Sequence, residues 1–252
     1  MRRTKIICTM GPATDNEDVL RDLMLNGMDV ARLNFSHGSH EEALERINRI
    51  KKVRDELNIP VAILLDTKGP EVRIKDFKEG KVELKEGQKF TLCTDDVVGD
   101  ENQVSITYAN LPNDVKVGSK ILIDDGLIEM EVISVKNSKI LCKVKNGGVV
   151  SNKKGVNVPN VALSMPYMSK KDIDDILFGI EQDVDFIAAS FVRTADDIRE
   201  IKTLLRDNGG RDIRIIAKIE NAEGVDNIDD IIRETHGIMV ARGDMGLSLI
   251  HI

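Results

Sequence analysis

Apolar residues in the first quarter of the chain follow two alternating spacings. Short runs rich in Ile, Val, Leu and Met alternate with segments in which apolar residues recur every three or four positions. The short runs indicate buried strands, and the second spacing indicates helices that bury one face. Strands apolar on both faces and separated by helices are typical of a parallel sheet or barrel. The expected strands are residues 5–10, 28–34 and 61–66, and the expected helices are residues 15–26 and a segment capped by Ser39.

The pattern changes between about residues 71 and 163, where no helical spacing is convincing. Short runs that alternate apolar and polar residues, such as KVEL, KFTLC and KILCKVK, are separated by Gly, Asp and Asn. This pattern is typical of a small antiparallel barrel or sandwich. Helix and strand patterns then alternate again, with elements expected at 169–182, 185–191, 195–207, 213–220, 224–233 and 237–242.

The number of residues per unit favours a barrel for the α/β part. Six βα units in the roughly 159 residues outside the insertion average about 26 residues each, close to the ~30 per unit of a (β/α)8 barrel. We therefore expect an incomplete (β/α)8 TIM barrel, interrupted by an inserted all-β barrel domain. Because an open sheet would expose unpaired edges, the chain is expected to stop inside the barrel. The expected divisions are 1–70 and 167–246 for the barrel, 71–166 for the inserted domain, and 247–252 for a non-native tail.

Composition excludes several classes of partner. The chain has 252 residues, a formal net charge of −7, two Tyr, six Phe and no Trp. That balance argues against a general nucleic-acid or anionic-membrane surface. The N-terminal apolar run is too short for a signal peptide or a membrane span, so a cytoplasmic protein is expected. The three cysteines, which match neither a zinc spacing nor a disulfide framework, are Cys8, Cys93 and Cys142.

Polar residues gather where the expected strands end. Arg32, Asn34 and Ser36 share one face if the chain stays extended through them, and Lys218 shares a face with Glu220. The other polar residues at strand ends are Asp66, Thr67 and Asp244. Barrel enzymes build their active sites at the C-terminal ends of the strands, so these residues predict a site there.

The residue types suggest chemistry on phosphate. Glu220 and Asp244 could hold Mg²⁺, which binds through a few carboxylates together with substrate oxygens and water. The cations that would neutralise phosphate oxygens are Arg32, Arg73 and Lys218. The oxygens suited to a monovalent cation are those of Asn34, Ser36, Asp66 and Thr67. Together these groups predict a phosphoryl-transfer site.

Each residue also has a structural interpretation. Lys218 or Glu220 could form an ordinary ion pair, and Asp66 could cap the following segment. His37 is better explained as a turn residue than as a general base. The residues that could serve only as turns, caps or a hairpin tip are Asn34, Ser36, Ser39 and the KKG segment at 153–155.

Seven segments, in order, resemble pyruvate kinase from about residue 4 to Gly246. They are TKIICTMGPAT, MDVARLNFSHG, LLDTKGPEVR, KKGVNVP, FIAASFVR, AKIENAEG and IMVARGDMG. The resemblance implies transfer of the phosphoryl group of phosphoenolpyruvate to ADP, giving pyruvate and ATP, with Mg²⁺ and usually K⁺ as cofactors. It also implies a homotetramer, and a lid formed by the inserted domain. Glu71, in the KGPE segment, stands where K⁺-dependent members have glutamate.

The resemblance further implies a role for each matching residue. Arg32 would contact the transferring phosphate, and Lys218 would stabilise both that group and the enolate left behind. The backbone at Gly243 and Asp244 would bind the substrate carboxylate, and the Mg²⁺ ligands would be Glu220 and Asp244. The K⁺ ligands would be Asn34, Ser36, Asp66 and Thr67. The nucleotide-binding residues would be Asn34, Phe35, Ser36, His37, Arg73 and Lys154.

The tail departs from the family. After ARGDMG the family continues with an acidic residue, a proline-containing stretch and two more barrel units, whereas this sequence ends LSLIHI. The expected strand-7 threonine is absent, so the chain alone is expected to be inactive. Two other classes of function stay open: a lyase or aldolase on a related barrel, and a non-catalytic fragment whose β domain binds only a nucleotide or a protein.

Overall fold

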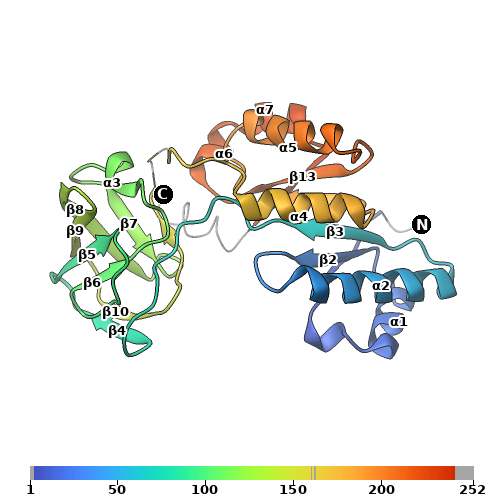
Figure 1. The fold of residues 1–252 in the computed structure, drawn as a ribbon, viewed down its shortest axis with the longest axis horizontal. Coiled ribbons are helices and arrows are strands. Elements are labelled where there is room, and N and C mark those ends of the chain that lie inside the picture. Colours follow the sequence, from blue (N-terminus) through green and yellow to red (C-terminus); the bar gives the residue numbers. More distant parts are fainter. Residues whose placement is uncertain (1–2, 160, 162, 242–252) are drawn as a thin grey trace. The chain divides into compact units, whose positions relative to one another are not determined.

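The computed structural model describes residues 3–159, 161 and 163–241 (Figure 1). The chain divides into two compact units. The first, the α/β unit, comprises Met1–Gly69, Tyr167–Ile219 and Asn227–Val240 as far as these are described. The second, the β unit, comprises Pro70–Pro166 and Glu220–Asp226 together with Ala241. No helix in the described ranges is long and apolar enough to cross a membrane.

In the part of the chain that the structure describes, a parallel sheet of six strands forms the centre of the α/β unit. The spatial order of the strands equals their order along the chain, and every neighbouring pair is parallel. Ile63, Leu64 and Leu65 in the third strand are fully buried, as expected for a strand covered on both faces. This order confirms the predicted α/β class with an incomplete barrel. The strands are β1 Ile7–Thr9, β2 Val30–Asn34, β3 Ala62–Asp66, β12 Phe186–Ala189, β13 Arg214–Ile219 and β14 Gly237–Val240.

Helices join consecutive strands of this sheet. The hydroxyl of Ser39 accepts the Glu42 amide at the start of α2, as the sequence spacing predicts. In α2 the residues Ile47, Ile50 and Val53 are buried, which explains their helical spacing. The helices are η1 Pro12–Thr14, α1 Glu17–Leu25, α2 His40–Leu57, α4 Lys170–Glu181, α5 Ala195–Asp207, α6 Ala222–Asp226 and α7 Ile228–Glu234.

The prediction of a single helix at 224–233 is wrong, because the structure has two helices, α6 and α7, separated at Asn227. The Asn227 side chain donates from Nδ2 to the carbonyl of Arg193 over 3.1 Å. The spacing of apolar residues does not depend on such a hydrogen bond, so this spacing predicts one helix through Asn227.

The described part of the β unit contains eight strands in two sheets. Within the larger sheet, ordered β11-β7-β8-β9-β5-β6, all pairs are antiparallel except β5 with β6. One short helix, α3 Leu111–Asp114, interrupts the region expected to be free of helices. The buried core includes Phe90, Leu92, Ile121 and Met130. The strands are β4 Lys81–Leu84, β5 Lys89–Cys93, β6 Gln103–Ser105, β7 Lys120–Ile123, β8 Ile128–Lys136, β9 Lys139–Val144, β10 Gly148–Ser151 and β11 Val156–Asn157.

The three thiols differ in burial, and this predicts a pH-dependent difference in reactivity. Burial raises the pKa of Cys142 to about 12 and also raises the pKa of Cys93. At pH 8 a thiol with a pKa of about 12 is ionised in about one molecule in 10⁴, and only the thiolate reacts. Cys8 is only partly buried. We therefore expect Ellman's reagent at pH 8 to modify one thiol quickly in the folded chain and all three in denaturant.

The Cys8→Ser variant is the control for this measurement, because it removes only the half-buried thiol. It should eliminate the fast phase and leave the slow reaction of Cys93 and Cys142 unchanged. Raising the pH should speed the slow phase, because more of each buried thiol ionises. A fast phase that persists in Cys8→Ser would contradict the burial described here.

Candidate active site

Asp66 is the centre of a buried polar cluster at the carboxyl ends of the strands. It is the last residue of β3 and is 1% exposed. Its Oδ2 accepts from Nε of Arg32 over 2.6 Å, and its Oδ1 accepts from Nζ of Lys218 over 3.0 Å. Arg32 lies on β2 and Lys218 on β13, so three strands contribute to the cluster. The structure therefore brings together two predicted phosphate-binding cations and one predicted K⁺ ligand.

Ser190 completes the cluster, although the sequence analysis gave it no role. It directly follows β12 and is 2% exposed. Its Oγ lies 2.8 Å from Nζ of Lys218 and 2.6 Å from the carbonyl oxygen of Thr67, and its amide donates to Thr67 Oγ1 over 3.1 Å. Asp66 was selected because it is polar and lies at the end of a predicted strand. Ser190 meets the same criterion, since it directly follows the neighbouring strand of the same parallel sheet. Applying the criterion to hydroxyl side chains would have selected Ser190 as well.

The end of β2 differs from the expectation of one shared polar face. The strand stops at Asn34, and Ser36 lies in a turn in which the Asn34 side-chain oxygen accepts the Ser36 amide over 2.9 Å. Asn readily closes such turns onto its own backbone, so Ser36 leaves the face that Arg32 and Asn34 share. Asn34 itself pairs with Asp66 in the β2–β3 register. The predicted K⁺ ligands Asn34 and Asp66 are thus neighbours on adjacent strands.

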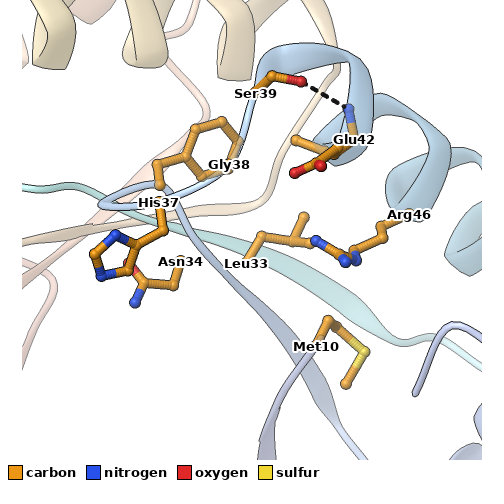
Figure 2. A pocket seen from close by; sticks show the side chains of 10 residues that line it. Met10, Leu33, Asn34, His37, Gly38, Ser39, Glu42 and Arg46 are labelled. Carbon is orange, nitrogen blue, oxygen red and sulfur yellow. Dashed lines mark hydrogen bonds between the residues drawn. The ribbon is translucent and has the colours of Figure 1, made fainter. Parts of the chain in front are cut away.

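The loop after β2 borders a small pocket (Figure 2). Asn34, Phe35 and His37, all predicted nucleotide-binding residues, belong to its lining. The ring of Phe35 is buried and packs near the rings of His40 and Phe178, with centroids 6.1 and 5.9 Å away. The remaining lining residues are Met10, Leu33, Gly38, Ser39, Glu42, Ala43 and Arg46.

Two predicted nucleotide-binding cations, Arg73 and Lys154, lie near each other within the β unit. Arg73 donates to the carbonyl of Lys153 over 2.6 Å and pairs with Glu71 over 2.5 Å. Nζ of Lys154 pairs with Oδ1 of Asp124 over 2.9 Å. The carbonyl of Lys154 also accepts the amide of Ile74, so backbone bonds join the two segments. Each cation is held by a carboxylate of its own unit.

The predicted magnesium and carboxylate-binding residues are only partly described. Glu220 directly follows β13 and is 5% exposed. Gly243 and Asp244 lie outside the described residues. Among the residues that are described, no group of three or more His, Cys, Asp or Glu side chains is arranged to hold a metal ion. The predicted Mg²⁺ pair therefore stays a prediction.

The electrostatics of the cluster suit an anion. Arg32 and Lys218 share the Asp66 carboxylate, so these three side chains together carry a formal charge of +1. Lys218 and Asp66 are 8% and 1% exposed, so little water screens them. Charges fixed in place before a reaction stabilise developing negative charge without reorganisation. The arrangement can therefore hold a phosphate or a carboxylate and stabilise negative charge on it.

Comparison with known proteins identifies the family. Residues 1–251 match the family model of the pyruvate kinase barrel domain. The chain is 50% identical to the pyruvate kinase of Clostridium perfringens over 250 residues, which are 99% of this chain and 53% of that protein. It is 53% identical to that of Geobacillus stearothermophilus over 250 residues, 98% of this chain and 43% of that protein. The chain spans about half the length of the curated relatives it matches. On its fold, its strand-end cluster and these matches, the chain belongs to the pyruvate kinase family.

Proposed function

We propose that this chain contributes the phosphoryl-binding residues of a pyruvate kinase, which transfers the phosphoryl group of phosphoenolpyruvate to ADP and gives pyruvate and ATP. The observation that carries the proposal is the convergence of Arg32 and Lys218 on the buried carboxylate of Asp66. A lone surface cation would be a weak argument. Two cations fixed by one buried acid at the strand ends of a barrel are a specific arrangement.

Each residue of the cluster has a role that follows from its position. The transition state of phosphoryl transfer is loose, and its negative charge spreads over the equatorial oxygens. Arg32, whose side chain is 28% exposed, would bind the phosphate from the open side. Lys218 would stabilise the transferring group and then the enolate. Asp66 would hold both cations in place, so that they need not reorganise during the reaction.

The donor set next to Asp66 fits a monovalent cation. The side-chain oxygen of Asn34 and the carbonyl of Thr67 are neutral, and Asp66 is already paired with Arg32 and Lys218. Mg²⁺ and Ca²⁺ usually need more uncompensated carboxylates than this. We propose that Asn34, Ser36, Asp66 and Thr67 bind K⁺. Bound Mg²⁺, which Glu220 and Asp244 would hold, would neutralise charge on the phosphoryl oxygens.

The nucleotide is proposed to bind at the loop after β2 and to contact Arg73 and Lys154. The pocket beside Asn34 and His37 supports the first part, and the backbone hydrogen bond that joins the Arg73 and Lys154 segments supports the second. Residues 71–166 would then act as a lid that excludes water from the reaction. The substrate carboxylate would meet the backbone at Gly243 and Asp244. We also propose the cytoplasmic homotetramer that is usual in the family.

The proposed activity is tested in an extended chain, in which residues 1–246 are joined to the C-terminal part of the Geobacillus stearothermophilus relative. Coupling pyruvate formation to lactate dehydrogenase should show turnover that needs both phosphoenolpyruvate and ADP. Turnover should fall when K⁺ is replaced by choline or when Mg²⁺ is removed. The 252-residue chain is assayed in parallel.

Two results would contradict the proposal. One is a folded extended chain without turnover. The other is cleavage of pyruvate aldol adducts, which would support the lyase alternative. Calorimetric titration of the extended chain with Mg·ADP and with phosphoenolpyruvate distinguishes the proposal from the alternative that the chain only binds a nucleotide. That alternative predicts heat from Mg·ADP and none from phosphoenolpyruvate.

A further inference from the structure

We infer that Ser190 is a positioning residue that fixes the ammonium of Lys218 and links it to the Asp66–Thr67 segment. The inference rests on the proposed function, because it assigns Lys218 the role described above. Ser190 is not proposed to contact substrate. It acts through Lys218.

The hydrogen-bond roles at the Ser190 hydroxyl follow from its neighbours. The hydroxyl has one proton to donate and can accept further hydrogen bonds. Nζ of Lys218, 2.8 Å away, can only donate, and the carbonyl of Thr67, 2.6 Å away, can only accept. Ser190 Oγ therefore accepts from Lys218 and donates to Thr67. The oxygen Oδ1 of Asp66 is farther, at 3.2 Å, and is already bound by Lys218.

These contacts restrict a side chain that is otherwise flexible. Lysine carries its charge on a four-carbon stem with several rotatable bonds, so one ion pair leaves it considerable freedom. Asp66 and Ser190 direct two of its N–H groups from two different strand ends. An ammonium held at two points has a defined position, which is what stabilisation of a developing charge requires. Loss of the Ser190 hydroxyl would remove one of these two contacts and hold the ammonium less closely.

Ser190 is itself held in place from several sides. Its carbonyl accepts from the Tyr167 hydroxyl over 3.0 Å, and its amide donates to Thr67 Oγ1. Gly69 packs against it so closely that a Cβ at position 69 would lie 2.6 Å from the Ser190 carbonyl oxygen. Gly69 also has φ +70°, a conformation that glycine adopts without strain. The segment after β3 and the residue after β12 therefore form one packed arrangement.

This arrangement connects the proposed K⁺ site to Lys218. The carbonyl of Thr67, which is a proposed K⁺ ligand, accepts the proton of the hydroxyl that orients Lys218. A shift of Thr67 would move Ser190 and so change the position of the ammonium. We therefore expect loss of the Ser190 hydroxyl to change both the rate of transfer and its dependence on K⁺.

The first test uses Ser190→Ala in the extended chain. Hydrogen bonds to charged groups are strong enough that losing this one should lower kcat about ten- to a hundredfold. The KM for phosphoenolpyruvate should change less than about threefold, because Arg32 still binds the phosphate. The K⁺ concentration that gives half-maximal activity should rise. Ser190→Thr keeps a hydroxyl and should recover most of kcat, whereas Ser190→Cys keeps the shape but accepts weakly and should not.

The matched control is Ser105→Ala in the β unit. Ser105 is also fully buried, and its hydroxyl donates to a backbone carbonyl and accepts a backbone amide. Its loss should lower stability without changing kcat selectively. An unchanged kcat in Ser190→Ala, or an equal fall in Ser105→Ala, would overturn the positioning role.

A second measurement separates this inference from the proposed function. In the extended chain labelled with ¹³C and ¹⁵N in lysine, the Lys218 ammonium signal is identified by its absence in Lys218→Met. Hydrogen bonding should slow its proton exchange, and Ser190→Ala should broaden or remove the signal. A signal that is unchanged in Ser190→Ala overturns the inference even if the enzyme is active. Loss of the signal in an enzyme without pyruvate kinase activity supports the contact and rejects only the function assigned to Lys218.

Discussion

Replacing Lys218 by Met is expected to abolish phosphoryl transfer in the extended chain while leaving substrate binding largely intact. Met is similar in length and apolar, so it removes the charge with little change in packing. The lost interaction is made mainly as negative charge develops on the transferring group, which affects kcat rather than KM. Since removing one such preorganised donor commonly costs about 10²–10³ in kcat, loss of a full charge should cost on the order of a thousandfold or more.

The measurement pairs the coupled assay with calorimetric titration of phosphoenolpyruvate in the presence of Mg²⁺. Lys51→Met is the control, because Nζ of Lys51 donates to the Gln182 carbonyl over 2.8 Å within the same unit and lies outside the cluster. It should retain the parent kcat. Lys218→Arg should also fail, since a planar guanidinium cannot make the same contacts to Asp66 and Ser190. Unchanged turnover in Lys218→Met would refute the assignment.

The overall architecture could be predicted because it depends on local pattern. Each strand of the α/β unit is a short apolar run next to a helix with its own spacing, and parallel strands joined by helices are laid down in chain order. Details that depend on one side chain were not predictable in this way. Helices α6 and α7 are separated at Asn227, whose side chain bonds the carbonyl of Arg193, 34 residues away, and the Asn34 side chain closes a turn onto the Ser36 amide. Neither event changes the apolar periodicity.

In the candidate site, too, the sequence pattern predicted some residues, and only the folded structure revealed another. Arg32, Asp66 and Lys218 attract attention in the sequence because a charge at the end of an apolar strand is unusual. Ser190 is small and neutral, and its partners Lys218 and Thr67 are 28 and 123 residues away in sequence. Only the packing of the two strand ends shows that its hydroxyl lies between them. Long-range hydrogen bonds of uncharged residues are the part of the site that the sequence did not reveal.

Replacing Asp66 by Asn is expected to destabilise the α/β unit strongly. The variant removes the carboxylate that Lys218 and Arg32 share, while Lys218 stays buried. Breaking a buried ion pair from one side costs about 3–5 kcal/mol, because an uncompensated charge stays in the interior. Hydrogen exchange of the amides in β2, β3 and β13 should therefore speed up more than elsewhere in the unit. Glu17→Gln, which breaks the exposed pair with Lys52, is the control and should leave these amides unchanged.

A double variant tests whether the uncompensated lysine causes the loss. If it does, Asp66→Asn should cost less stability when Lys218 is already Met than when Lys218 is present. The difference between the two backgrounds measures the coupling of the pair, because the two side chains are in contact and their effects are not additive. Urea unfolding of the extended chain, monitored by hydrogen exchange of the amides in β3 and β13, gives the required stabilities. They are those of the parent, each single variant and the double variant. Additive losses would show that the ammonium of Lys218 does not depend on Asp66, and the central ion pair of the proposed site would have to be rejected.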